Sequence, residues 1–133
     1  MKREVKKNAK ILINRAQGDF LFNPDEDQEP RYLQAFLLQA SVIEGLLRES
    51  CNSYNRKNKV TGLSAPKMFH QAAREARASG SISKGQFEKI EAYIDFRNKV
   101  VHTILEKNSR ADLENNTNKH YQIGSEIIAF LLK

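Results

Sequence analysis

Residues 30–54 decide the fold class of this chain, and they read PRYLQAFLLQASVIEGLLRESCNSY. Apolar side chains return every three or four positions, which is the spacing that places them on one face of an α-helix. The stripe consists of Leu33, Phe36, Leu37, Ala40, Ile43, Leu47 and Cys51. A half-buried strand alternates apolar and polar residues instead, and this stretch does not. The stretch therefore predicts a long amphipathic helix with one buried face.

The same helical period continues on both sides of this segment. It predicts further helices at residues 3–17, 65–79, 84–105 and 110–132. Ser83 followed by Gln86 forms a capping box at the start of the fourth helix, and Ser109 with Asp112 marks the start of the fifth. No strand is expected. The predicted fold class is all-α, an up-down bundle of four to five helices in a single domain, residues 1–133.

Length, composition and charge limit the class of protein. The chain has 133 residues, 40% hydrophobic and 29% charged, which is typical of one globular domain. A net charge of +6 favours a polyanionic partner, although many proteins with this charge bind no nucleic acid. The single cysteine excludes an internal disulfide framework. No apolar run is long enough for a signal peptide or a membrane span, so a cytoplasmic protein with no membrane association is expected.

The charges are unevenly distributed along the chain. Residues 1–15 and 56–77 each carry six basic residues against one acid. Residues 19–29 carry five acids and no base. The segment FNPDEDQEP at 22–30 is acidic and is bracketed by prolines. It predicts an acidic loop between the first and second helices.

Several polar residues fall where their helices should be apolar. Glu44 lies within the stripe of the second helix, and Arg97 lies near the middle of the apolar arc of the fourth, with Asn98 and His102 along one flank. A desolvated cation costs several kcal/mol unless it is paired. Periodicity leaves two interpretations open: a structural salt bridge between Arg97 and Glu44, or a functional site built around Arg97.

The run FRNKVVH at 96–102, late in a long helix, resembles the signature of the HEPN superfamily, an Arg with a polar neighbour and a His a few positions later. Four residues separate Arg97 from His102, and Asn98 is the polar neighbour. The likeness covers roughly residues 30–132, with ASVIEGLL at 40–47 in an earlier helix. Ile104 stands where the nucleotidyltransferase-partnered toxin subgroup has Tyr, so no subgroup is assigned.

The resemblance implies a helical bundle that forms a homodimer and brings two Arg/His pairs into one cleft. It also implies a metal-independent endoribonuclease, such as a toxin or antiphage effector, with a possible antitoxin or regulatory protein as partner. Other members are inactive and bind nucleotide, RNA or a protein.

The residue types fit this chemistry. His102 can act as base or acid, and Arg97 can bind a phosphate through two parallel hydrogen bonds. Asn98 is expected to orient the histidine or the phosphate, and Glu44 to hold Arg97. Five positions separate Arg97 and His102 by about 140° around the helix and about 7.5 Å along it. They are poorly placed to share a phosphate within one helix, so a second copy is expected to complete the site.

The remaining candidates are weaker. A basic strip on the third helix and the segment before it could follow an RNA backbone, although such strips are usually only solvated; its RNA-binding candidates are Lys59, Lys67, Arg74 and Arg77, with His70 beside them. His120 is expected to be a packed histidine of the core or an interface. The three histidines have no ligand spacing, so no metal and no cofactor are predicted.

Three functions therefore remain open: a homodimeric HEPN ribonuclease, an idle HEPN module that binds nucleotide or RNA, and a helical interaction subunit in which Arg97 and Glu44 are structural.

Overall fold

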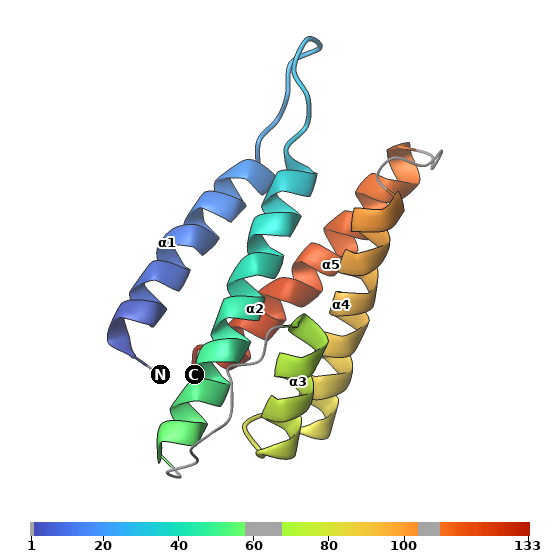
Figure 1. Cartoon of the computed structure of the whole chain (residues 1–133). Coiled ribbons are helices and arrows are strands. Elements are labelled where there is room, and N and C mark those ends of the chain that lie inside the picture. Colours follow the sequence, from blue (N-terminus) through green and yellow to red (C-terminus); the bar gives the residue numbers. More distant parts are fainter. Residues whose placement is uncertain (1, 58–67, 104–109) are drawn as a thin grey trace.

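The computed structural model describes residues 2–57, 68–103 and 110–133, with side chains except at 54–57, 101–103 and 110–111. Five α-helices and no strand occur in this part of the chain (Figure 1). They are α1 (Arg3–Phe20), α2 (Tyr32–Lys57), α3 (Phe69–Ala78), α4 (Lys84–Thr103) and α5 (Arg110–Leu131). The all-α prediction is confirmed, and the helices pack as a bundle.

The described helix ends lie within three residues of the predicted ones except at the start of α3. Met68 has an extended backbone, with φ −112° and ψ 149°, so α3 begins at Phe69 and the predicted start at residue 65 is wrong. At the start of α4 the predicted capping box is confirmed. The Ser83 amide donates to Gln86 Oε1 at 2.9 Å, and the Gln86 amide donates to Ser83 Oγ at 3.2 Å. Ser109 lies outside the described residues, and Asp112 lies in the first turn of α5.

The acidic segment at 22–30 is a loop, as predicted, and it extends beyond the ends of α1 and α2 (Figure 1). Its two ends are held together by Arg31. The Arg31 guanidinium lies 3.9 Å from the centroid of the Phe22 ring, and its Nη1 lies 3.8 Å from Asp19 Oδ1. A cation over an aromatic face is attracted by the ring, so Arg31 fixes the path of the chain into α2.

The core is built around α2, and its largest fully buried side chains include Phe36, Ile43, Leu47, Tyr93 and Ile127. On α4 the residues that face this core are Ile90, Tyr93, Ile94 and Val100, each at most 1% exposed. These four residues of α4 are therefore buried within a single chain.

α4 is the element that carries the candidate residues of the site. It packs against α3 and α5 and crosses α2. Among the described residues, no helix is long and apolar enough to span a membrane.

Candidate functional site

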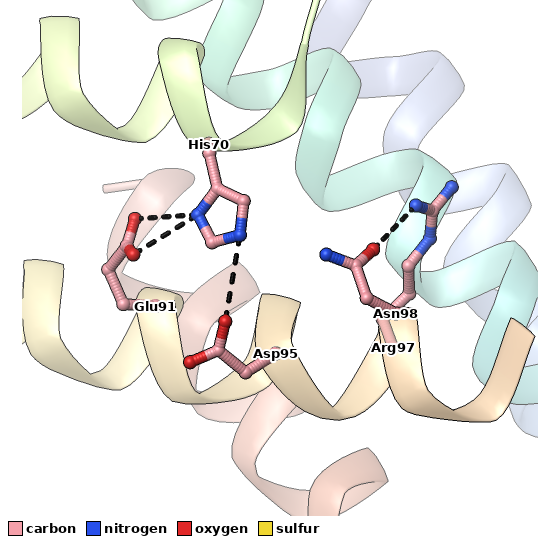
Figure 2. Close-up of polar contacts among 5 residues, drawn as sticks. All are labelled: His70, Glu91, Asp95, Arg97 and Asn98. Atoms are coloured by element: carbon pink, nitrogen blue, oxygen red, sulfur yellow. Dashed lines mark hydrogen bonds and ion pairs between the residues drawn. The ribbon is translucent and has the colours of Figure 1, made fainter. Parts of the chain in front are cut away.

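Arg97 and Asn98 lie side by side on α4. The Arg97 Nη1 donates to Asn98 Oδ1 at 3.1 Å, and both side chains are half-buried (Figure 2). By helical spacing Asn98 lies about 100° from Arg97, towards the flank that leads to His102. The hydrogen bond therefore joins the guanidinium to the first residue of that flank.

The carboxylate of Glu44 is engaged elsewhere. Glu44 Oε1 accepts from Arg48 Nη2 at 2.7 Å, one turn along α2. Within the described part of the chain no ion pair joins Glu44 to Arg97, so the expected Arg97–Glu44 salt bridge is not formed. An i, i+4 pair within one helix is the shorter route to satisfy Glu44, because both partners are already fixed by the same backbone.

His102 belongs to α4, whose backbone continues to Thr103. Its side chain lies outside the described residues. Its position in the helix is fixed by spacing: it follows Asn98 by four residues, or about 40° around the axis. The backbone thus places His102 one turn beyond the amide that holds Arg97.

The charge of Arg97 acts on the buried core nearby. Burial raises the pKa of Tyr93 well above its ordinary value, and Tyr121 adds to this, whereas Arg97 acts in the opposite direction. The positive charge of Arg97 is thus close enough to the interior to affect the pKa of Tyr93. A guanidinium in such a place is partly desolvated, which strengthens its attraction for an incoming anion.

The RNA-binding candidates are only partly described. Arg74 and Arg77 are exposed on α3, consistent with a basic surface strip. Lys59 and Lys67 lie outside the described residues. His70 leaves this strip and turns towards α4 (Figure 2). Its Nδ1 lies 3.1 Å from Glu91 Oε1 and Oε2, and its Nε2 lies 3.6 Å from Asp95 Oδ1.

The contacts of His70 were not predicted from the sequence. Glu91 and Asp95 are four residues apart, so they share a face of α4 and can hold one imidazole between them. That spacing was a usable signal, but it does not by itself say which neighbouring helix supplies the partner. The cluster fixes α3 to α4 beside the flank that carries Asn98.

His120 is packed, as expected. Its ring stacks on Phe96 with centroids 3.8 Å apart and planes 8° from parallel, and its Nδ1 donates to the Asn116 carbonyl at 2.8 Å. Phe96 also makes an edge contact with Phe36 of α2. These contacts assign His120 to the joint between α4 and α5.

No group of three or more His, Cys, Asp or Glu side chains in the described residues is arranged to hold a metal ion. Burial and the charge of Glu75 raise the pKa of the Cys51 thiol to about 11, so Cys51 is a core residue rather than a nucleophile. No family model, curated protein or solved structure matches this chain.

Proposed function

We propose that this protein is a metal-independent endoribonuclease whose reaction takes place at Arg97, Asn98 and His102 of α4. One observation carries the proposal. Arg97 is a half-buried cation held by the neutral amide of Asn98, while the carboxylate expected to neutralise it is paired with Arg48. A guanidinium held in this way keeps its full charge for an anion such as a phosphate.

The interaction-subunit alternative depended on a structural ion pair between Arg97 and Glu44. Because that pair is absent among the described residues, it no longer explains why an arginine stands on this face of α4. A phosphate-binding role explains both the cation and its uncharged neighbour. The resemblance to HEPN proteins supports the choice of RNA as the substrate whose phosphate Arg97 binds.

The proposed step is an internal transesterification of RNA. His102 takes the proton from a ribose 2′-hydroxyl, whose oxygen attacks the adjacent phosphorus. The bond to the 5′-oxygen of the next nucleotide breaks, and that oxygen takes a proton from solvent. Arg97 stabilises the charge that develops on the non-bridging oxygens, and Asn98 keeps the guanidinium at the flank where His102 lies.

Each chain has its own set of these residues. The sequence suggested a cleft shared by two copies, because Arg97 and His102 diverge by about 140° around the helix. The Arg97–Asn98 hydrogen bond shortens that divergence by drawing the guanidinium to the Asn98 flank. The described core-facing residues of α4, Ile90, Tyr93, Ile94 and Val100, are also buried within the chain's own bundle. We therefore propose that the residues act within one chain.

The exposed arginines of α3 and the net charge of +6 supply the longer-range attraction for RNA. Such contacts steer the polyanion towards α4 without choosing a sequence. A protein with this activity fits the role of a toxin or antiphage effector, in which RNA cleavage need not be narrowly specific.

The test is cleavage of mixed RNA by the purified protein in EDTA, with His102→Ala and Arg97→Ala beside wild type. We expect wild type to cleave and each variant to lose about 10²–10⁴-fold in rate. His120→Ala is the matched control, since that histidine is packed on Phe96, and it should keep its activity.

RNA-binding measurements distinguish an active ribonuclease from an inactive module that only binds RNA. RNA binding by wild type without cleavage would assign the protein to the inactive alternative. We expect His102→Ala to bind RNA as wild type does, because a neutral imidazole adds little to phosphate affinity. Arg97→Ala should bind more weakly and with a shallower dependence on salt, because one phosphate contact is lost.

A further inference from the structure

A strip of polar residues runs along one side of α4 and ends at the proposed site. Its members follow one another at intervals of four, three and four positions: Glu91, Asp95, Asn98 and His102. Such intervals keep side chains on one side of a helix, and residues three apart have their Cβ atoms about 5–6 Å apart. His70 reaches this strip from α3 and lies against Glu91 and Asp95 (Figure 2). A second histidine is therefore close to Asn98 of the proposed site.

The two ring nitrogens of His70 have different surroundings. Its Nδ1 lies 3.1 Å from both carboxylate oxygens of Glu91, and because an ionised carboxylate only accepts, Nδ1 is the donor. Its Nε2 lies 3.6 Å from Asp95 Oδ1, which is too long for a hydrogen bond. When the imidazole is protonated, Nε2 also carries a hydrogen. Glu91 thus fixes the direction of this N–H, and no hydrogen bond within the described part of the chain uses it.

Asn98 lies between His70 and the guanidinium of Arg97 in the close-up view (Figure 2). Asn98 Oδ1 accepts from Arg97 Nη1, and the amide nitrogen of Asn98 points the other way, towards His70 (Figure 2). Three hydrogen-bond donors therefore follow one another: the guanidinium, the amide nitrogen and the imidazole. A phosphate in an RNA chain offers two non-bridging oxygens and the bridging 5′-oxygen. Arg97 and Asn98 can hold the non-bridging oxygens, which leaves the 5′-oxygen for His70.

The spacing along α4 suits an in-line displacement, in which the attacking and leaving oxygens lie on opposite sides of the phosphorus. Asp95 marks the place of His70, and it precedes His102 by seven residues, or about 10.5 Å along the axis. Arg97 and Asn98 lie between these two positions in the helix. A phosphate bound by Arg97 and Asn98 thus has one histidine position towards each end of α4.

The imidazole of His70 can be reached from solvent. The side chain of His70 is 27% exposed, and that of Asp95, beside Nε2, is 66% exposed. Because Asp95 is exposed and makes no hydrogen bond to Nε2, it can turn aside when a phosphate arrives, whereas Glu91 keeps the ring in place. One ring nitrogen held by a carboxylate, with the other facing the reacting atoms, is also how the histidine of a Ser-His-Asp triad is oriented.

We propose that His70 is the general acid of the RNA cleavage, an inference that rests on the function proposed above. His102 takes the proton of the 2′-hydroxyl, and the 2′-oxygen forms its bond to phosphorus. The bond from phosphorus to the 5′-oxygen breaks, and the electron pair of that bond takes the proton of His70 Nε2. The neutral imidazole then regains a proton from solvent, so solvent supplies the proton through His70. Glu91 is a positioning residue, because it acts by holding the ring.

The test uses two substrates that differ in one atom. Each is a short oligonucleotide with an RNA bond that wild type cleaves in mixed RNA, and in the second substrate sulfur replaces the bridging 5′-oxygen. A thiolate leaves without a proton, so the sulfur substrate needs no general acid. We expect His70→Asn, which keeps a donor towards Glu91, to cleave the oxygen substrate about 10²–10⁴-fold more slowly than wild type in EDTA. It should cleave the sulfur substrate at nearly the wild-type rate, whereas His102→Ala should be slow on both.

Glu91→Gln tests the same role with the imidazole in place, and it should slow the oxygen substrate more than the sulfur substrate. Glu114→Gln, at an exposed carboxylate of α5, is the matched control and should cleave both as wild type does. Thermal unfolding confirms that each variant folds. Wild-type rates in His70→Asn, or equal losses on both substrates, would overturn the role of His70 and leave the ribonuclease proposal standing. A wild type that cleaves no RNA would overturn both.

Discussion

The contacts of Arg97 distinguish a structural role of this residue from a binding role. When the cation of a buried structural ion pair is removed, its partner is left unpaired. The free energy of unfolding then falls by about 3–5 kcal/mol. Among the described residues, the side-chain hydrogen bond that Arg97 would lose is the one to the Asn98 amide oxygen. That hydrogen bond joins two neighbouring residues of α4, so it does not tie one helix to another.

We expect Arg97→Ala to change the free energy of unfolding by about 1 kcal/mol or less, the value of one hydrogen bond. Urea denaturation followed by circular dichroism measures it. Asn98→Ala is the companion variant and should behave alike, because it breaks the same contact. A loss of about 3 kcal/mol or more for Arg97→Ala, the loss of a buried ion pair, would restore a structural role.

Cys51 is a second residue whose environment predicts its chemistry. Its pKa is raised to about 11 by burial and by Glu75, so the thiol stays protonated and inert near neutral pH. We expect iodoacetamide to label the folded protein far more slowly at pH 8 than the urea-unfolded protein, as measured by mass spectrometry. Equal rates would show that the thiol is accessible.

The raised pKa of Cys51 also predicts how the free energy of unfolding changes with pH. The unfolded thiol ionises near its ordinary pKa of 9.0, below the folded value of about 11. The contribution of the protonated Cys51 thiol to the free energy of unfolding is therefore complete below pH 9. It is lost as the pH rises from 9 to 11. Unfolding midpoints measured over that range should fall more for wild type than for Cys51→Ala.

At the level of helices, the sequence predicts what depends on local chemistry. The capping box at Ser83 and the apolar stripe of α2 needed only spacing along one helix, and both are confirmed. The start of α3 was placed at residue 65 instead of Phe69, because the extended backbone of Met68 has no signature in propensity.

Contacts between helices were less predictable. Gln39 is 2% exposed and was not singled out. Its Nε2 donates to the Tyr121 carbonyl at 2.9 Å, and its Oε1 accepts from the Tyr93 hydroxyl at 2.9 Å. A glutamine on a helix surface and one buried among three helices look the same in sequence. The Glu44–Arg48 pair differs from Gln39, because its i, i+4 spacing is visible in the sequence, which the prediction of an Arg97–Glu44 pair did not take into account.

Gly124 of α5 makes the Gln39 contact possible. A Cβ at this position would collide with the Gln39 amide and lie 2.8 Å from Tyr93 Cε2. We expect Gly124→Ala to reduce the free energy of unfolding by about 1–3 kcal/mol, as overpacking does.

Gly18→Ala is the matched control for this substitution. Gly18 lies in α1, and no atom lies within 4 Å of the place that a Cβ would take, so alanine there should be neutral or stabilising by up to about 1 kcal/mol. Thermal and urea unfolding of the two variants compare the positions directly. Equal effects at both would show that Gly124 is not held close to Gln39.

For the whole molecule, the proposal requires each chain to carry a complete set of the site residues. On α4 the described core-facing residues Ile90, Tyr93, Ile94 and Val100 are buried within the chain's own bundle. Under the proposal, each α4 carries its own Arg97, Asn98 and His102.

Mixing two inactive variants tests this arrangement. If Arg97 and His102 act within one chain, a mixture of Arg97→Ala and His102→Ala, unfolded together and refolded to exchange subunits, should stay inactive in EDTA. Each variant refolded alone and refolded wild type are the controls. Recovery of a substantial part of wild-type activity in the mixture would show that the site is shared between copies.

The chemical ends of the cleaved RNA test the central claim most directly. We expect wild type in EDTA to produce fragments with 2′,3′-cyclic phosphate and 5′-hydroxyl ends, and to leave an all-2′-deoxy copy of the same sequence intact, because the attacking oxygen is the 2′-hydroxyl. The absence of cleavage, activity undiminished in His102→Ala, or fragments with 3′-hydroxyl and 5′-phosphate ends would contradict it.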